Sequence, residues 1–206
     1  MYNQSMGRRS VRTERRAEIT AAFARVLARH GYAGATIAAV AAESGIAPGL
    51  VHHHFADKQD LLASLIGDLM QRFRERTRAL EARPNAAAAD ADALEPNPDA
   101  LESYVTAAVA LGDSADALAA RCWVGVLAEA VRDPELFAQV RRLLDTEIEA
   151  IRRRGGPRFT VHDGGAVLAF IIGALVFGAF APRKTAGFAA PSLRKLVGAL
   201  RAPRAT

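Results

Sequence analysis

Three consecutive histidines, His52, His53 and His54, carry the most versatile chemistry in this chain of 206 residues. An imidazole can bind a metal ion, take up a proton near neutral pH, or hydrogen bond to a base or a phosphate. Consecutive helical residues point about 100° apart, so three in a row cannot converge on one ion as an i, i+4 pair can. The pattern favours contacts along a surface, and we expect neither a metal nor another cofactor.

The histidines lie within residues 36–58, a stretch with the pattern of a helix-turn-helix. Thr36 can cap a first helix, in which apolar residues recur at i, i+3 and i+4. Gly45 supplies the left-handed residue that commonly ends a helix. Pro48 then starts a second helix of about two turns that ends near Phe55. Because so short a helix is unstable alone, we expect it to present side chains from a scaffold.

The neighbouring segments complete that scaffold. An apolar stripe predicts a preceding helix over about 13–30 that ends at Gly31, and Asp57 caps a following helix of about 25 residues. Alanine is abundant, and alternating runs of Val, Ile and Thr are nearly absent. The chain is therefore predicted to be all-α, with about nine helices, the last over about 192–201 after Pro191.

The charge of the chain indicates an anionic partner. Its formal net charge is +5 and its pI is about 10.0. Arginines crowd residues 8–16 against a single Glu14, directly upstream of the helix-turn-helix. This basic arm could instead be a solvated, disordered tail. Because a helix-turn-helix follows it directly, we expect it to bind double-stranded DNA. The arm consists of Arg8, Arg9, Arg12, Arg15 and Arg16.

DNA binding requires cations and N–H donors at phosphates, and side chains at base edges. Leu50, His52 and His53 are the candidates for the major groove, where Leu50 could touch a thymine methyl group. His54 and Lys58 suit phosphates. Protonated histidines would bind DNA more tightly, so we expect affinity to rise as pH falls. The predicted DNA-binding residues are Arg8, Arg9, Arg12, Thr36, Pro48, Gly49, Leu50, His52, His53, His54 and Lys58.

Residues 165–181 form an apolar run without a charge. A membrane span is one interpretation, since the run is at the lower edge of spanning length. The other is a helix buried nearly all round, in which Gly173 and Gly178 let a second helix approach closely. We favour the second interpretation. Together with the apolar face of the last helix, it predicts a homodimer interface, and we expect no association with a membrane.

One combination of residues is more specific than any single motif: Phe23, Gly31, Tyr32, Thr36, Ile37, Val40, Ala41, Gly45, Ile46, Pro48, Gly49, His54, Phe55, Lys58, Leu61 and Leu62. With this spacing, residues 19–62 closely resemble the DNA-binding region of the tetracycline-repressor (TetR) family of bacterial transcription regulators. Ala47 stands where the family often has a Ser or Thr cap, typically a loss of ~1 kcal/mol, and His52 stands at its usual tyrosine. The resemblance therefore leaves the operator preference open.

The C-terminal part resembles the effector domain of the choline-responsive (BetI-like) branch, through Trp123 followed by LAEAVRDPEL and through the glycine-rich apolar helix. The resemblance implies a cytoplasmic bacterial homodimer that binds a palindromic operator and is released by a small-molecule effector. Residues 1–62 would form the DNA-binding domain and residues 63–206 the effector-binding and dimerisation domain. The alternatives are a membrane-associated regulator anchored through 165–181 and a helix-turn-helix protein without a small-molecule effector.

Aromatic side chains of the C-terminal part are the candidates for the effector pocket. Their faces can hold a quaternary ammonium by cation–π attraction, although any one of them could instead be ordinary core. Trp123 is the best single candidate. The full set is Phe73, Tyr104, Trp123, Phe137, Phe170 and Phe177.

The sequence shows no pattern typical of an enzyme. A glycine-rich phosphate loop, a metal-ligand pair and a nucleophile elbow are all missing from it, so we expect a regulator and not an enzyme. Cys122 is the single cysteine, which rules out an intrachain disulfide and makes a reducing, intracellular setting the expectation.

Overall fold

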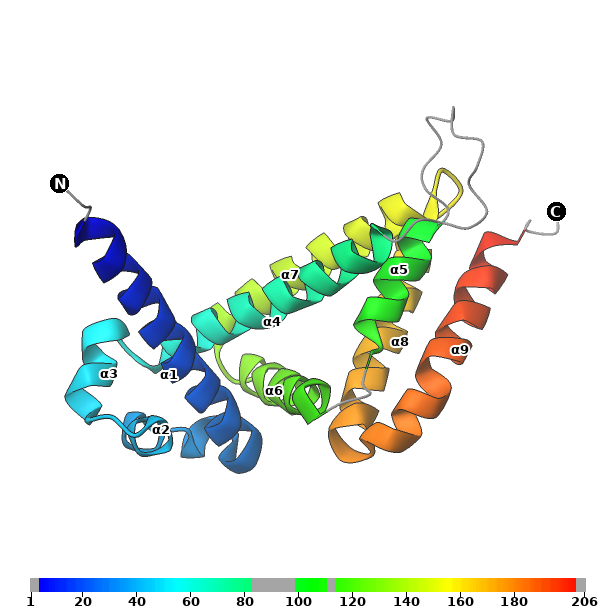
Figure 1. Ribbon diagram of the computed structural model, residues 1–206. Helices are drawn as coiled ribbons and strands as arrows, with labels where there is room; N and C mark the ends of the chain where they lie inside the picture. Colours follow the sequence, from blue (N-terminus) through cyan, green and yellow to red (C-terminus); the bar gives the residue numbers. More distant parts are fainter. Residues whose placement is uncertain (1–3, 83–98, 111–113, 203–206) are drawn as a thin grey trace. The chain divides into compact units, whose positions relative to one another are not determined.

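The structure, a computed structural model, describes residues 4–82, 99–110 and 114–202. Within these ranges it contains nine helices and no strand, which confirms the all-α prediction (Figure 1). In chain order the helices are α1 (Gln4–Gly34), α2 (Ile37–Ser44), α3 (Pro48–His54), α4 (Lys58–Glu81), α5 (Asp99–Ala108), α6 (Ser114–Ala130), α7 (Pro134–Gly155), α8 (Val161–Phe180) and α9 (Pro182–Arg201).

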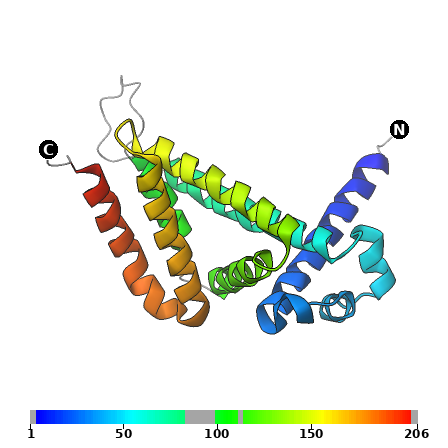
Figure 2. The same cartoon turned by 180° about the vertical axis from the view of Figure 1, so that it is seen from behind.

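The chain forms two compact units, Met1–Met70 and Gln71–Thr206. Helix α4 contributes to both, because it runs from Lys58 to Glu81. In the N-terminal unit α1 packs against α2 and α3, and in the C-terminal unit α8 packs against α6, α7 and α9 (Figure 2). The predicted division after residue 62 concerns function, and it remains a prediction.

Apolar side chains from four helices form the core of the N-terminal unit. Phe23 of α1, Val40 of α2, Val51 of α3 and Leu61 of α4 are all 0% exposed. Full burial of a side chain of this kind stabilises the folded state by about 1.5–3 kcal/mol. Helix α3 has only seven residues, so it depends on Val51 and on its neighbours to keep its place.

The turn between α2 and α3 forms as the sequence predicts. The hydroxyl oxygen of Thr36 accepts a 3.1 Å hydrogen bond from the N–H of Ala39 and thereby caps α2. Gly45 ends α2 in the left-handed region, with φ 68° and ψ 29°, where a Cβ would cost energy. The N–H of Ile46 then bonds to the carbonyl oxygen of Ala41 at 3.0 Å. These bonds fix the direction in which α3 departs.

Two predicted helix boundaries are wrong. Helix α1 begins at Gln4 and not near residue 13, because the intervening segment contains no proline to stop it. Helix α9 begins at Pro182 and continues through Pro191, where the sequence predicted a break. Pro191 removes the hydrogen bond to the carbonyl group of Gly187, but both residues are exposed, so water can satisfy that carbonyl group.

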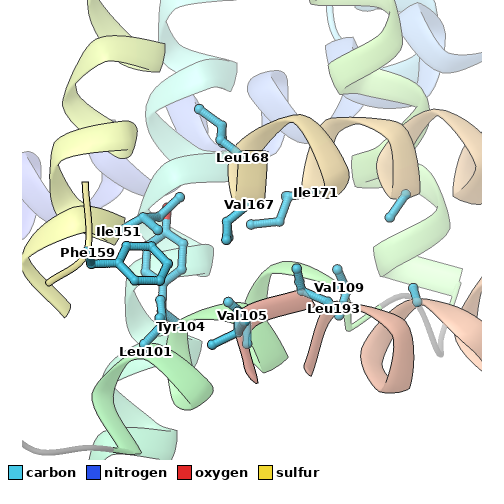
Figure 3. Close-up of a cluster of buried hydrophobic side chains, with 13 residues drawn as sticks. Leu101, Tyr104, Val105, Val109, Ile151, Phe159, Val167, Leu168, Ile171 and Leu193 are labelled. Atoms are coloured by element: carbon cyan, nitrogen blue, oxygen red, sulfur yellow. The ribbon is translucent and has the colours of Figure 1, made fainter. Parts of the chain in front are cut away.

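One hydrophobic core organises the C-terminal unit. Leu101 and Val105 of α5, Ile151 of α7, Val167 of α8 and Leu193 of α9 project into it (Figure 3). Each of these side chains is at most 2% exposed. The fold of this unit therefore rests on contacts between helices that are far apart in the sequence.

Helix α8 is strongly apolar but only partly buried. Its most apolar window has a mean hydropathy of 2.0 and is 39% buried, and no other helix in the described ranges is long and apolar enough to cross a membrane. A core helix of a globular protein satisfies the same criteria. Thr160 and Asp163 cap the helix start reciprocally. Gly164 lies so close to α7 that an added Cβ would be 2.8 Å from the carbonyl oxygen of Ile148.

Candidate nucleic-acid interface

Helix α3 exposes the side chains that the sequence assigned to base reading. His52 and His53 are exposed, and Leu50 is 39% exposed, whereas Val51 and Phe55 point into the core. Ala47 gives the helix start no side-chain hydrogen bond, as expected from the sequence. Gly49 has open space around the position of a Cβ, so a backbone or a phosphate can come close there. The outer face of α3 is therefore short, cationic when protonated, and accessible.

His54 takes a different position from its two neighbours. Its side chain is buried, and its Nδ1 atom has no hydrogen-bond partner. Burial lowers the pKa of His54, and the positive charges of His53 and Arg12 lower it further. A phosphate contact, as the sequence predicted, would require this ring to leave its buried position.

Arg16 links three segments of the N-terminal unit. Its Nη1 donates to the carbonyl oxygen of His54, and its Nη2 lies 3.3 Å from Oδ1 of Asp60. Its guanidinium carbon lies 4.0 Å from the centre of the Phe55 ring. The sequence-based list of DNA contacts omitted Arg16. Its position one turn before the buried Ile19 of α1 is a signal in the sequence, but Arg15 shares both this position and its partial burial.

The predicted phosphate contacts are only partly available. The amine of Lys58 donates to the carbonyl oxygen of Tyr32 and lies 3.9 Å from the centre of the Tyr32 ring. Thr36 is exposed, and its oxygen accepts the capping bond, so its hydroxyl hydrogen remains able to donate. Arg12 is exposed on α1. The side chains of Arg8 and Arg9 lie outside the described part of the chain.

Two other arginines near the helix-turn-helix share one carboxylate. Glu43 of α2 accepts from Arg25 at 2.6 Å and also from Arg29, and both arginines belong to α1. These hydrogen bonds lower the pKa of Glu43 below its ordinary range. The exposed Arg12 near the start of α1 is therefore more available to an anionic partner than Arg25 and Arg29 are.

The six aromatic residues predicted for an effector pocket do not converge on one place. Phe73, Tyr104 and Phe170 gather at the core of the C-terminal unit, where the Phe73 and Tyr104 rings pack edge to face at 4.9 Å. Phe137 and Phe177 are 52% and 62% exposed. Trp123 is half-buried on α6. Tyr104 also has polar partners, since its hydroxyl donates to Glu147 at 2.5 Å and Arg154 lies 5.1 Å from its ring centre.

The described residues offer little for metal or thiol chemistry. In these ranges no group of three or more His, Cys, Asp or Glu residues could hold a metal ion. Cys122 is fully buried, and burial raises the pKa of its thiol to about 12. A thiol with that pKa stays protonated at neutral pH and is a poor nucleophile.

Residues 19–65, which contain the whole helix-turn-helix, match the family described as "Bacterial regulatory proteins, tetR family". An "HTH-type transcriptional regulator BetI" from Paraburkholderia phytofirmans is 36% identical over 85 residues, which are 39% of this chain and 44% of that protein. The regulator of the same name from Escherichia coli O157:H7 is 26% identical over 166 residues, or 78% of this chain and 80% of that protein. This chain therefore contains the DNA-binding region of the TetR family.

Solved structures support the same fold along nearly the whole chain. A transcriptional regulator from Rhodococcus sp. Rha1 has a TM-score of 0.73 at 21% identity and covers 90% of this chain and 95% of its own. A regulator from Saccharomonospora viridis "in complex with choline" has a TM-score of 0.66 at 19% identity and covers 90% and 96%. TetR family proteins are transcriptional regulators and not enzymes, which agrees with the missing enzyme motifs.

Proposed function

We propose that this chain is a TetR family repressor that binds a palindromic operator as a homodimer and leaves it when a small molecule enters the C-terminal unit. The observation that carries the proposal is the outward face of α3, where Leu50, His52 and His53 are exposed within the segment that matches the family. The expected setting is the bacterial cytoplasm, where an operator is accessible.

In the proposed complex, Leu50, His52 and His53 read base edges in the major groove, because α3 presents them outward from a fixed backbone. Pro48 and Gly49 at the start of α3 bring the backbone close to a phosphate. Arg8, Arg9 and Arg12 of α1 contact the flanking phosphates together with Thr36 and Lys58. Lys58 must exchange its bond to Tyr32 for that contact.

The homodimer is proposed from the exposed side of α8. Ala166, Ala169, Val176, Phe177 and Phe180 are exposed at helical spacing without an intervening charge. Phe188 of α9 extends this surface, since its ring lies 6.3 Å from that of Phe177. A contiguous apolar face of this kind marks an interface, and a second copy of the chain would cover it. A membrane is the alternative cover, because α8 is long enough to span one.

The proposed effector is a small organic cation. Phe73 and Tyr104 provide aromatic rings, and Glu147 provides a carboxylate beside them. The effector would take the place of Arg154, which lies 5.1 Å from the centre of the Tyr104 ring. The choline complex of the Saccharomonospora viridis regulator gives this class of ligand a precedent on the same fold. The half-buried Trp123 of α6 remains a candidate for the pocket wall.

An in vitro selection from random DNA duplexes tests the DNA-binding part of the proposal. The wild-type protein should enrich an inverted repeat, and its affinity should fall steeply as salt rises. Choline and related cations are then added to the complex, and release of the duplex identifies an effector. Enrichment of no sequence, or binding that is independent of salt, would contradict the proposal.

A further inference from the structure

We propose that Arg16 is a positioning residue for operator binding, one that fixes the C-terminal end of α3 and does not itself contact DNA. The inference rests on the proposed role of α3 as the reading helix. It separates Arg16 from the rest of the arginine arm, to which its sequence position assigns it.

The first support is the hydrogen bonding at the end of α3. The carbonyl oxygen of His54, the last residue of the helix, accepts from Nη1 of Arg16. The final carbonyl groups of a helix have no partner within the helix, so an outside donor is required. A guanidinium there also suits the negative end of the helix dipole. Arg16 thus satisfies an acceptor that α3 cannot satisfy itself.

The second support is that Arg16 is held from two other directions. Its Nη2 lies 3.3 Å from Oδ1 of Asp60, in the first turn of α4, and its guanidinium covers the ring of Phe55. Asp60 is itself fixed, because its Oδ2 accepts from the N–H of Ala56 at 3.1 Å and its own N–H bonds to Oδ1 of Asp57 at 2.8 Å. The guanidinium therefore joins α1, the end of α3 and the start of α4 in one rigid arrangement.

The third support concerns the ends of α3, since the buried Val51 already anchors its middle. The helix has seven residues, and Ala47 leaves its start without a side-chain cap. Next to the Arg16 contact, the His54 ring is buried and its Nδ1 atom has no hydrogen-bond partner. Burial of this polar atom destabilises the folded state, so other contacts at the end of α3 must offset the cost. Small displacements of a reading helix are sufficient to lose base contacts, so the Arg16 contacts should matter to affinity.

A lysine cannot replace these contacts. Arg16 uses two nitrogen donors of a planar fork and the face of that fork at the same time. An ammonium group has the same charge but no plane and no fork. Arg16→Lys therefore keeps the positive charge at this position but removes the paired donors and the flat face of the guanidinium. This variant separates the effect of charge from the effect of geometry.

The test compares Arg16→Lys, Arg16→Ala and Arg12→Ala on the duplex selected with wild-type protein, by fluorescence anisotropy across a salt series. Both Arg16 variants should bind about tenfold more weakly or worse, with the slope of log affinity against log salt unchanged. Arg12→Ala should reduce that slope by about 1, because an exposed arginine at a phosphate releases counterions. Unchanged affinity in Arg16→Lys, or a slope reduced as in Arg12→Ala, would overturn the proposal.

Amide hydrogen exchange of the free protein provides a readout that needs no DNA. In Arg16→Lys the α3 amides should lose protection while those of α2 keep it. If wild-type protein selects no duplex but this local loss is seen, the proposed function fails and the structural role of Arg16 stands. Equal protection of α3 in wild type and variant would refute the role of Arg16 whatever the DNA result.

Discussion

The hydroxyl of Tyr104 donates a 2.5 Å hydrogen bond to Oε2 of Glu147, which joins α5 to α7 inside the C-terminal unit. The same ring packs against Phe73 of α4. Burial raises the pKa of Tyr104 above its ordinary range, and the charge of Glu147 raises it further. The phenol therefore stays a neutral donor throughout the physiological pH range.

Tyr104→Phe should lower the free energy of unfolding by about 1–3 kcal/mol, because a bond to a charged acceptor is lost while the ring packing is retained. Urea unfolding measures this change. A double-mutant cycle with Glu147→Ala isolates the pair, and the coupling energy should be at least ~0.5 kcal/mol. Strict additivity of the two single variants would show that the hydrogen bond contributes nothing to stability.

His54 should make the N-terminal unit less stable in acid. Burial lowers the pKa of His54, and the positive charges of His53, Arg12, Arg16 and Arg15 add to this effect. The unfolded chain takes up the proton near the ordinary value of about 6.5, whereas the folded chain takes it up only at lower pH. Between these two pH values the unfolded state binds more protons, so the free energy of unfolding falls as pH falls.

Denaturant titrations at several pH values between 5 and 7.5 measure this dependence. His54→Gln should flatten it, since glutamine has no proton to take up. His30→Gln, at an exposed position on α1, is the matched control and should leave the dependence as it is in wild type. An identical pH dependence in wild type and His54→Gln would contradict the assignment.

His52→Ala should relax sequence preference without changing the salt dependence. His52 is exposed on α3 and is assigned to base edges, where one good contact discriminates by about 1–3 kcal/mol per base pair. Affinities for a set of operators with single base-pair changes give the measurement. The loss of discrimination should be confined to one or two adjacent positions in each half-site, and a uniform loss across all positions would indicate a phosphate contact instead.

The local architecture of the DNA-binding unit could be predicted from the sequence because its signals are short-range. The Thr36 cap and the Gly45 turn depend on backbone geometry that a few neighbouring residues determine. The buried position of His54 and the contacts of Arg16 depend on residues some forty positions away, which no local pattern contains. The same reason explains why the predicted pocket aromatics were not separated into core residues such as Tyr104 and exposed ones such as Phe137.

The two helix boundaries in error have different physical causes. A proline, or a basic and polar composition, is weak evidence against a helix when packing or solvent offsets the lost hydrogen bond or the low helix propensity. Helix α9 continues through Pro191 because the carbonyl group of the exposed Gly187 is open to water, and its inward face still buries Leu193 and Val197. Packing of an amphipathic face thus outweighs local propensity in this case.

Phe177→Glu should convert the proposed homodimer to a monomer. The Phe177 ring is 62% exposed in the single chain and lies within the uncharged face of α8, so a carboxylate there would be buried without a partner in a dimer. Sedimentation or light scattering should give about twice the chain mass of 21.9 kDa for wild type and the chain mass itself for the variant. Val131→Glu is the matched control, because Val131 is 80% exposed at the end of α6 and lies outside that face. A monomeric wild-type protein that floats with anionic vesicles would favour the membrane alternative, and a dimer that survives Phe177→Glu would move the interface elsewhere.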